Sequence, residues 1–237
     1  MNVPERIIPD ETEPGIVALH LKRYEFARPY AEGKDVLDAG CGVGYGTAFL
    51  AESARRAVGV DISRDAIAYA RRRYGAHNVR YEVGDLSALP FADNSFDVVC
   101  AFETVEHLAE PERFVAEAAR VLRKGGLLIA STPQVDALEE QPENPFHEHE
   151  YSAPDFEALL RGRFSSVELL GQRRRQTARH RALQRADRLG LRKRLPFLRK
   201  LGRVVTGTPA MAEVSSEGVE IVPELDGATE LIAVCRA

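Results

Sequence analysis

The sequence predicts a single α/β domain whose mostly parallel sheet carries helices on both faces. Between residues 35 and 131, short apolar runs of strand length alternate with stretches of helical length, a pattern typical of repeated strand–helix–strand units. Several of the apolar runs end in an acidic residue or in glycines. Because ligands of such sheets bind outside the carboxyl ends of the strands, we expect the functional residues to gather along that edge.

The composition supports one globular domain with an elaboration, since 237 residues can bury a full core. Hydrophobic residues make up 44% of the chain and charged residues 29%, as in ordinary globular proteins. No apolar run is long enough to cross a bilayer, and residues 1–10 lack the apolar region of a secretory signal, so a cytoplasmic protein is expected. The three cysteines show no C-x-x-C spacing, which argues against both a disulfide framework and a zinc site.

The chain begins with an arm and a helix. Residues 1–13 are expected to be mobile or extended, and a proline can open a helix over residues 14–30. This helix precedes the glycine-rich strand and can lie across the mouth of the ligand site, where His20, Arg23 and Tyr24 can face the ligand. They can equally be surface and packing residues of a helix that buries one stripe.

The glycine-rich stretch from Asp35 to Gly46 indicates the kind of ligand. An apolar strand is followed by glycines at 40, 42, 44 and 46 and by a helix from Tyr45 to Glu52. This order leaves backbone N–H groups unpaired at the positive end of the helix dipole, where nucleotide-like ligands are held. The spacing weakens a dinucleotide interpretation, because the third position of G-x-G-x-x-G falls on Tyr45. The ligand contacts predicted here are Asp38, Gly40, Cys41, Gly42 and Tyr45.

A second strand, over residues 56–61, ends in Asp61, 23 positions beyond Asp38. A carboxylate at this distance can accept hydrogen bonds from both ribose hydroxyls. The alternative is a helix cap, but Ser63 already serves that purpose for the helix that follows. Asp61 is therefore the predicted ribose ligand.

The third strand is predicted over residues 79–83, after a helix over residues 63–74. It leads into Asp85 and Leu86. Asp85 can accept a hydrogen bond from an adenine amino group, and Leu86 and Ile62 can sandwich the ring.

A fourth strand leads to Phe102 and Glu103, which are also predicted to contact the cofactor. A helix opened by Pro111 is expected to end in the basic and glycine residues 123–126. The fifth strand is predicted over residues 127–131.

Taken in this order, the motifs resemble class I S-adenosylmethionine-dependent methyltransferases. The resemblance rests on Asp-x-Gly-x-Gly-x-Gly from Asp38, on the acids at 61 and 85, and on Leu-Pro-Phe and Ser-Phe-Asp-Val-Val within residues 89–99, which look like the small-molecule, methyltransferase type 11-like branch. It covers residues 34–131. It implies S-adenosyl-L-methionine as cofactor and a Rossmann-like seven-stranded, mostly parallel sheet whose last strand is antiparallel. Residues 167–171 and 231–236 are the candidates for strands six and seven.

The family's cofactor already carries an activated methyl group, so the protein must align the acceptor and, for a hydroxyl, take its proton. Histidine suits this task at neutral pH, and His107, His147 and His149 are the candidates. In an extended loop His147, His149 and Tyr151 share one face. Each histidine can instead be satisfied by a neighbouring backbone group. His-x-His with flanking glutamates can chelate a divalent ion, but a separated third ligand is missing, so no metal is predicted.

The acceptor is expected to be a hydroxyl of a small molecule, sugar or lipid-linked glycan. Enzymes that methylate amines of nucleic-acid bases commonly carry Asn/Asp-Pro-Pro-aromatic after strand four, and this chain has Ala-Phe-Glu-Thr at 101–104. An RNA methyltransferase and a non-catalytic cofactor-binding protein are the alternatives, since a fold alone does not define a substrate.

Residues 172–203 contain thirteen Lys or Arg and one acid, so this segment carries +12 and the rest of a chain of net charge −4 carries −16. We expect residues 1–171 and 230–237 to form the methyltransferase core, and residues 172–229 to form a basic helical insertion that acts as a lid or docking element. Its amphipathic pattern suits an anionic membrane surface, such as the inner membrane face. It could also supply phosphate contacts to RNA, or simply be a solvated basic face.

Overall fold

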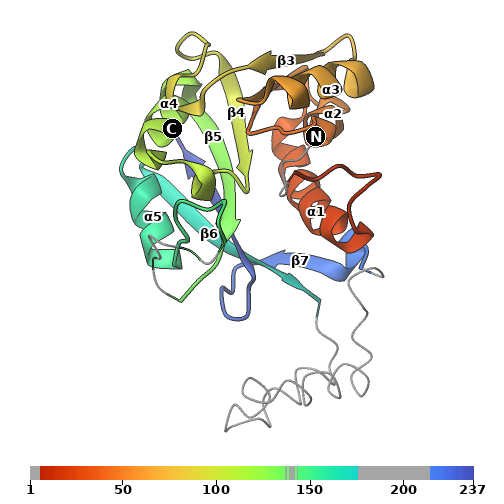
Figure 1. The fold of residues 1–237 in the computed structure, drawn as a ribbon. Helices are drawn as coiled ribbons and strands as arrows, with labels where there is room; N and C mark the ends of the chain where they lie inside the picture. Colours follow the sequence, from red (N-terminus) through yellow and green to blue (C-terminus); the bar gives the residue numbers. More distant parts are fainter. Residues whose placement is uncertain (1–5, 137, 139–141, 143, 176–213) are drawn as a thin grey trace, which may run out of the picture.

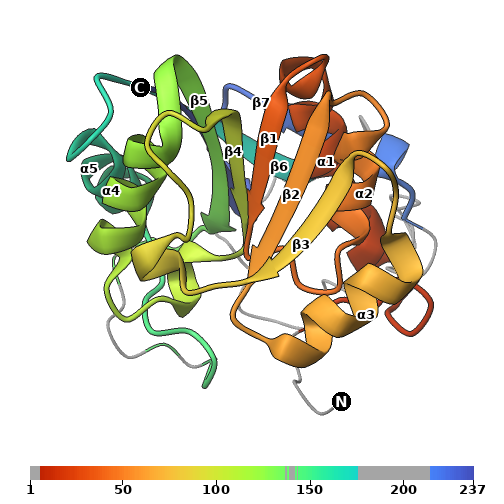
Figure 2. The same ribbon diagram turned by 90° about the horizontal axis from the view of Figure 1, so that it is seen from above.

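The computed structural model describes residues 6–136, 138, 142, 144–175 and 214–237. Within these residues eight strands form one sheet, flanked by helices (Figures 1 and 2). The strands are β1 (Asp35–Ala39), β2 (Arg56–Asp61), β3 (Val79–Val83), β4 (Phe96–Phe102), β5 (Leu122–Pro133), β6 (Ser166–Arg174), β7 (Val219–Val222) and β8 (Glu230–Arg236). The helices are α1 (Pro14–Ala31), α2 (Tyr45–Ala51), α3 (Arg64–Tyr74), α4 (Pro111–Val121) and α5 (Ala153–Arg161), with short 3-10 helices η1 (Leu86–Ala88), η2 (Val105–His107) and η4 (Ser216–Gly218).

The sheet has the strand order β3-β2-β1-β4-β5-β8-β6-β7. Strands β1 to β5 run parallel. Strand β8 lies antiparallel between β5 and β6, and β7 runs antiparallel to β6 at the edge. The predicted Rossmann-like sheet with an antiparallel last strand is confirmed. The described sheet has eight strands instead of seven, because Val219–Val222 adds an edge strand too short to show a clear period in the sequence.

Helices cover both faces of the sheet (Figure 2), and an apolar core lies between the helices and the sheet on each face. On one face, α4 and α5 pack Phe114 and Phe156 against strand residues such as Leu128. On the other face, α1 and α2 pack Tyr24 and Leu50 against the sheet, and α3 packs beside β2 and β3. Parallel strands covered on both faces read as continuous apolar runs, which is why these strands can be predicted from sequence.

Helix α4 ends earlier than predicted. The basic and glycine run at 123–126 was expected to terminate the helix, but α4 ends at Val121, and Leu122 already pairs with Phe96 of β4. The side chain of Arg123 then reaches the acidic residues at the starts of β1 and β4. Residues 123–126 therefore belong to β5. The ion pairs of Arg123 stabilise this extended conformation at the edge of the sheet.

The described ends of the predicted 172–229 insertion belong to the sheet, which corrects that boundary. Strand β6 continues to Arg174, and β7 pairs with it. Val214 and Val219 pack against Ala18 of α1, and Gln172 donates a hydrogen bond to the carbonyl of Leu19. Most of the basic segment, residues 176–203, lies outside the described residues, as does its predicted docking role. Every helix in the described part of the chain is too short or too polar to span a bilayer.

The glycine turn should tolerate substitution far less than an exposed turn does. Gly44 has φ 87°, and an added Cβ would lie 2.6 Å from Cε1 of Tyr81 and 2.7 Å from Cβ of Ala70. Gly33 has φ 66° with no atom within 4 Å of such a Cβ. Both alanine variants should lose about 1–2 kcal/mol for the left-handed backbone, and Gly44→Ala should lose a further 1–3 kcal/mol, roughly, from overpacking. Urea unfolding of both variants measures this, and equal losses would contradict the tight packing at Gly44.

Candidate active site

The buried carboxylate of Asp38 organises the turn after β1. Its Oδ2 accepts a hydrogen bond from Oγ1 of Thr47 at 2.6 Å, and its Oδ1 accepts one from the Tyr24 hydroxyl at 3.3 Å. Gly46 admits the tyrosine ring, because a Cβ there would lie 1.9 Å from Cζ of Tyr24. Asp38 thus joins β1, α2 and α1. It does not line the ligand cavity, and its predicted contact with the cofactor stays a prediction.

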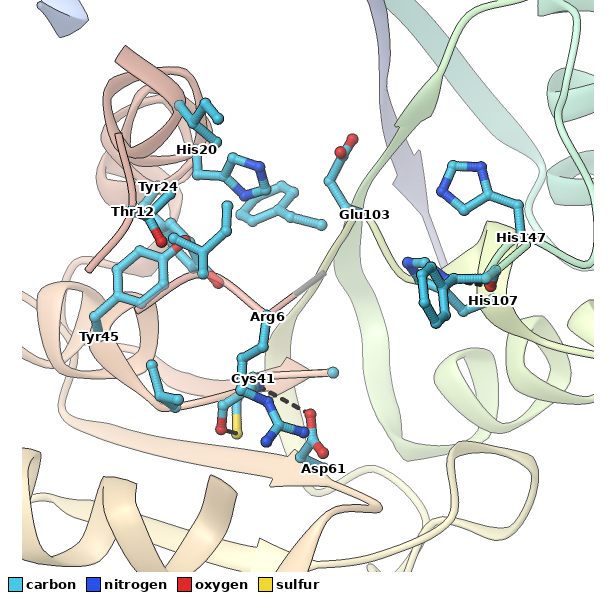
Figure 3. Close-up of a pocket in the computed structure, with 17 residues that line it drawn as sticks. Arg6, Thr12, His20, Tyr24, Cys41, Tyr45, Asp61, Glu103, His107 and His147 are labelled. Atoms are coloured by element: carbon cyan, nitrogen blue, oxygen red, sulfur yellow. Dashed lines mark hydrogen bonds between the residues drawn. The ribbon is translucent and has the colours of Figure 1, made fainter. Parts of the chain in front are cut away.

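A cavity of about 620 Å³ lies at the carboxyl ends of β1, β2 and β4 (Figure 3). The residues that line it come from the N-terminal arm, from α1, from the glycine turn and from the loops after β4 and β5. The sequence analysis therefore placed the site at the right edge of the sheet. Eight of the predicted cofactor residues line the cavity, namely Tyr24, Gly40, Cys41, Gly42, Tyr45, Asp61, Phe102 and Glu103.

Asp61 is held in place by the glycine turn. Its Oδ2 accepts from the backbone N–H of Gly42 at 2.9 Å, and its Oδ1 accepts from the backbone N–H of Ser63 at 2.8 Å. Ser63 caps α3 by accepting from the N–H of Ala66, as predicted. A carboxylate has about four acceptor positions, so two bonds leave Asp61 able to accept from a diol. Its ribose role stays a prediction.

The predicted adenine contacts do not line the cavity. Asp85 is exposed and accepts a hydrogen bond from the N–H of Ser87 at 2.8 Å, so it caps η1. This bond lowers the pKa of its carboxyl. Leu86 is buried in the core, whereas Ile62 is 73% exposed. An aspartate two residues before a turn amide satisfies that amide locally, which accounts for the place of Asp85, and the adenine contacts stay a prediction.

The N-terminal arm forms part of the cavity wall, which the sequence did not predict. Arg6, Ile7 and Thr12 line the cavity, and Figure 3 shows Arg6 extending toward Asp61. The arm folds back because the N–H of Ile8 donates to Oγ1 of Thr12 at 3.1 Å. The Pro-Asp pair within this turn is a turn signal that could have indicated it.

The polar residues of helix α1 lie in two places, some at the cavity and one inside the protein. His20 and Tyr24 line the cavity, as predicted, whereas Arg23 is buried. The Nη2 atom of Arg23 lies 3.3 Å from Glu103 and 3.4 Å from Glu230. Burial lowers the pKa of His20 to about 3, with a smaller effect from Arg23. His20 is therefore neutral at neutral pH.

Glu103 places a negative charge at the cavity. Its backbone conformation is strained. Its φ of 49° lies in the left-handed region, which costs free energy that the surroundings must supply. Its N–H donates to the Oγ of Ser131 at 3.1 Å. Burial alone would raise the pKa of Glu103, but Arg23, His20 and a hydrogen bond with Glu230 together outweigh burial and lower the pKa to about 2. Burial and the charge of Glu103 raise the pKa values of the neighbouring carboxyls of Glu106 and Glu230.

The structure brings two of the three candidate histidines together. The rings of His107 and His147 lie 4.9 Å apart between centroids and face the cavity beyond Glu103 (Figure 3). The backbone N–H of Glu148 donates to the carbonyl of Glu106 at 2.7 Å, which fixes the loop over η2.

His149 does not line the cavity and is removed from the candidates. The N–H of His147 bonds the carbonyl of Asn144, and this turn replaces the extended loop that would have aligned His147, His149 and Tyr151. The ring of His149 instead lies beside that of Tyr151, 6.0 Å between centroids.

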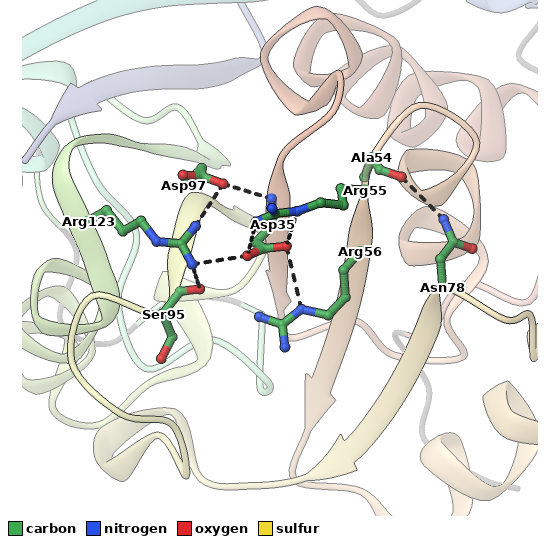
Figure 4. Close-up of polar contacts among 8 residues, drawn as sticks. All are labelled: Asp35, Ala54, Arg55, Arg56, Asn78, Ser95, Asp97 and Arg123. Atoms are coloured by element: carbon green, nitrogen blue, oxygen red, sulfur yellow. Dashed lines mark hydrogen bonds and ion pairs between the residues drawn. The ribbon is translucent and has the colours of Figure 1, made fainter.

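The opposite edge of the sheet carries a charge network that is separate from the cavity (Figure 4). Arg55 forms two hydrogen bonds to the carboxylate of Asp35, at 3.0 and 2.6 Å. Arg123 lies 3.0 Å from Asp35 and 2.8 Å from Asp97. Burial would raise the pKa of Asp35, but these arginines lower it. The network links the amino-terminal ends of β1, β4 and β5, so it has a structural role.

The residues of the cavity fit S-adenosylmethionine. The volume lies within the range of small-molecule and cofactor sites. An added Cβ at Gly42 would meet no atom within 4 Å, so the turn leaves open space for a ligand. Asp61 can accept from a ribose diol beside it. A family model described as a methyltransferase domain matches residues 37–130. Over residues 37–130 the chain thus matches a methyltransferase domain, and the relatives and solved structure below are named S-adenosylmethionine-dependent methyltransferases.

Two curated relatives of this chain come from mycobacteria. A probable S-adenosylmethionine-dependent methyltransferase of Mycolicibacterium smegmatis is 43% identical over 131 residues, 54% of this chain and 50% of the relative. One of Mycobacterium tuberculosis is 41% identical over 160 residues, 66% of this chain and 58% of the relative. The chain thus spans only 50–58% of the length of these relatives.

Two further comparisons are with a relative that is named for its substrate and with a solved structure. A fatty-acid O-methyltransferase of Mycolicibacterium smegmatis is 39% identical over 105 residues, 44% of this chain and 38% of the relative. The crystal structure of an S-adenosylmethionine-dependent methyltransferase from Thermotoga maritima matches with a TM-score of 0.65 at 17% identity, covering 96% of this chain and 95% of that one. The structural match confirms the methyltransferase fold.

Asp61 should carry much of the affinity for the cofactor. Losing hydrogen bonds to a charged group costs about 1.5–3 kcal/mol, so Asp61→Ala should bind S-adenosylhomocysteine at least about tenfold more weakly. Asp65→Ala is the matched control, because Asp65 is an exposed acid in the first turn of α3. Calorimetric titration compares the two, and wild-type affinity in Asp61→Ala would refute the assignment.

Asp38 should make the stability of the domain depend on pH. Burial raises its pKa from 3.8 to about 6, so the folded protein holds this proton more tightly than the unfolded chain. Wild type should therefore gain stability relative to Asp38→Asn as the pH falls from about 6 to about 4, by up to about 3 kcal/mol. Urea unfolding of both proteins at several pH values tests this. A pH-independent difference would show that Asp38 is not the responsible group.

Proposed function

We propose that the protein is an S-adenosylmethionine-dependent methyltransferase that methylates a hydroxyl of a small molecule, sugar or lipid-linked glycan. The observation that carries this proposal is the shared cavity. One part is lined by Gly40, Gly42 and Asp61, and another by His107 and His147. A cofactor and an acceptor can therefore meet within one cavity, which is what in-line methyl transfer requires.

The histidine pair is the part of the cavity suited to an acceptor hydroxyl. When bound, S-adenosylmethionine supplies a methyl group on a positively charged sulfur, and transfer to oxygen leaves the electron pair of the broken S–C bond on the sulfur. The acceptor hydroxyl must lose a proton as its oxygen forms the new bond. His107 and His147 lie where that proton can leave, either directly to a ring nitrogen or through a group that they hold.

The charge of the cavity favours a neutral acceptor over an anionic one. Glu103 lines the cavity and stays negative, because Arg23 and other neighbours lower its pKa to about 2. A second carboxylate nearby would be repelled in this partly buried site. A hydroxylated lipid or glycan thus fits better than a free fatty acid, although one relative is named a fatty-acid O-methyltransferase.

The RNA alternative depends on residues 172–203, of which the structure describes 172–175. In this described part, Arg173 and Arg175 both pair with Glu220, at 2.9 and 3.8 Å. Labelled S-adenosylmethionine incubated with separate lipid, small-molecule and RNA fractions distinguishes the acceptors. The proposal requires label in a hydroxylated lipid, glycan or small molecule, and label only in RNA would overturn it.

The two histidines should affect turnover and not cofactor affinity. With the acceptor found in that screen, His107→Ala and His147→Ala should each lose roughly 100- to 10,000-fold in kcat. Binding of S-adenosylhomocysteine should stay close to that of wild type. His149→Ala is the control from the same loop. Turnover within a few-fold of wild type in both variants would exclude the pair from proton removal.

A further inference from the structure

The candidate histidines share a cluster with a carboxylate that the sequence did not connect to them. One ligand atom each of Glu106, His107 and His147 lies within 4.8 Å of the others. Glu106 stands on η2 and His147 in the loop after β5, 41 residues along the chain. The sequence alone showed no separated third ligand for a metal beside His147. The structure places Glu106 and His107 there.

Glu106 is an incompletely satisfied group. Its side chain has no exposed surface, and neither carboxylate oxygen has a hydrogen-bond partner with normal geometry. The hydroxyl of Thr132 and the backbone N–H of Glu106 itself are near enough to act on the carboxyl as hydrogen-bond donors, although neither forms a hydrogen bond of normal geometry with it. Buried carboxylates are normally paired, hydrogen-bonded or bound to a metal. A cation at the cluster would satisfy Glu106.

Each histidine is oriented as a metal-binding histidine usually is. Nδ1 of His107 lies 2.8 Å from the carbonyl oxygen of Phe146, and Nδ1 of His147 lies 2.9 Å from Oε1 of Glu150. Because both partners only accept hydrogen bonds, Nδ1 is the donor in each pair, and Nε2 is the nitrogen that would bind an ion. At His147 this nitrogen lies 3.0 Å from Nδ2 of the Asn144 amide, a contact that an ion would replace. Metal-binding histidines typically donate their other N–H to such a carbonyl or carboxylate.

We propose that Glu106, His107 and His147 bind a first-row divalent cation, with Zn²⁺ as the reference ion, at the acceptor end of the cavity. Two imidazoles and one carboxylate are the ligand set of catalytic zinc sites that keep a position open for water or substrate. Imidazole ligands disfavour Mg²⁺ and Ca²⁺, which prefer oxygen. His107 and His147 line the cavity, so the open position faces it.

This inference rests on the proposed function and specifies how the histidines act. A cation held by Glu106, His107 and His147 would lower the pKa of an acceptor hydroxyl, which would then lose its proton to water near neutral pH. The acceptor oxygen then forms its bond to the methyl carbon while the S–C bond of the cofactor breaks, with the electron pair retained by sulfur. No oxidant or reductant is needed, and the ion keeps its charge throughout.

The decisive experiment measures metal binding directly. Tag-free, chelator-treated full-length protein is titrated with Zn²⁺ alone in a calorimeter, and with Co²⁺ while the visible absorption of the bound ion is recorded. Wild type should bind one ion with saturation. Glu106→Gln, His107→Ala and His147→Ala should each weaken binding at least about tenfold, and Glu150→Gln, which alters only the partner of a ligand, about 10- to 100-fold.

The matched control is His149→Ala, which removes a histidine of the same loop that lies outside the cluster and should leave Zn²⁺ affinity unchanged. Glu106→Gln keeps the shape of the side chain, and circular dichroism checks that it folds. The absence of saturable binding to wild type would overturn the inference, as would binding that Glu106→Gln leaves unaltered.

Cofactor binding separates this inference from the proposed function. S-adenosylhomocysteine affinity is measured on the same chelated protein. Metal binding without cofactor binding would sustain the metal site and refute the methyltransferase proposal. Full methyl transfer after chelation would sustain the methyltransferase and refute the role of the ion.

Discussion

The carboxylate of Asp38 accepts hydrogen bonds from Thr47 and Tyr24 inside the protein, and the arrangement of the site depends on these contacts. They join the end of β1 to α2 and to α1, so the glycine turn and the helix beside the cavity are positioned together. Gly46 is part of the same constraint, because a side chain there would occupy the space of the Tyr24 ring. Asp61 then binds the turn from β2 through the N–H of Gly42. The ligand edge of the sheet is thus organised before any ligand is bound.

Charge is distributed differently at the two edges of the sheet. At the amino-terminal edge Asp35 and Asp97 are paired with arginines, and the pairing lowers their pKa values even though partial burial acts the other way. At the carboxyl edge one buried arginine, Arg23, faces several carboxyls. The first arrangement stabilises strand packing. The second leaves negative charge where an acceptor or a cation would bind, and incompletely paired buried groups of this kind cluster at functional sites.

Much of the fold and part of the site could be predicted from sequence. The strands of a doubly covered sheet are apolar runs, and the residues that follow them meet at one edge, so Gly40, Asp61, Glu103 and His107 were placed correctly at the cavity. Asp85 and His149 lie outside the cavity for local reasons. Asp85 caps its own turn, and a turn at Asn144 redirects the loop that carries His149.

Other features depend on tertiary contacts that no sequence period reveals. The arm that places Arg6 at the cavity is one example. The proximity of Glu106 to His147 is another, since it arises when the loop after β5 folds back onto η2.

A crystal structure with S-adenosylhomocysteine bound is the most direct test of the ligand site. We expect the ribose to lie against Asp61 and the sulfur to be directed toward Glu103 and the His107–His147 pair. A ligand bound elsewhere, or with its sulfur directed away from the histidines, would contradict it.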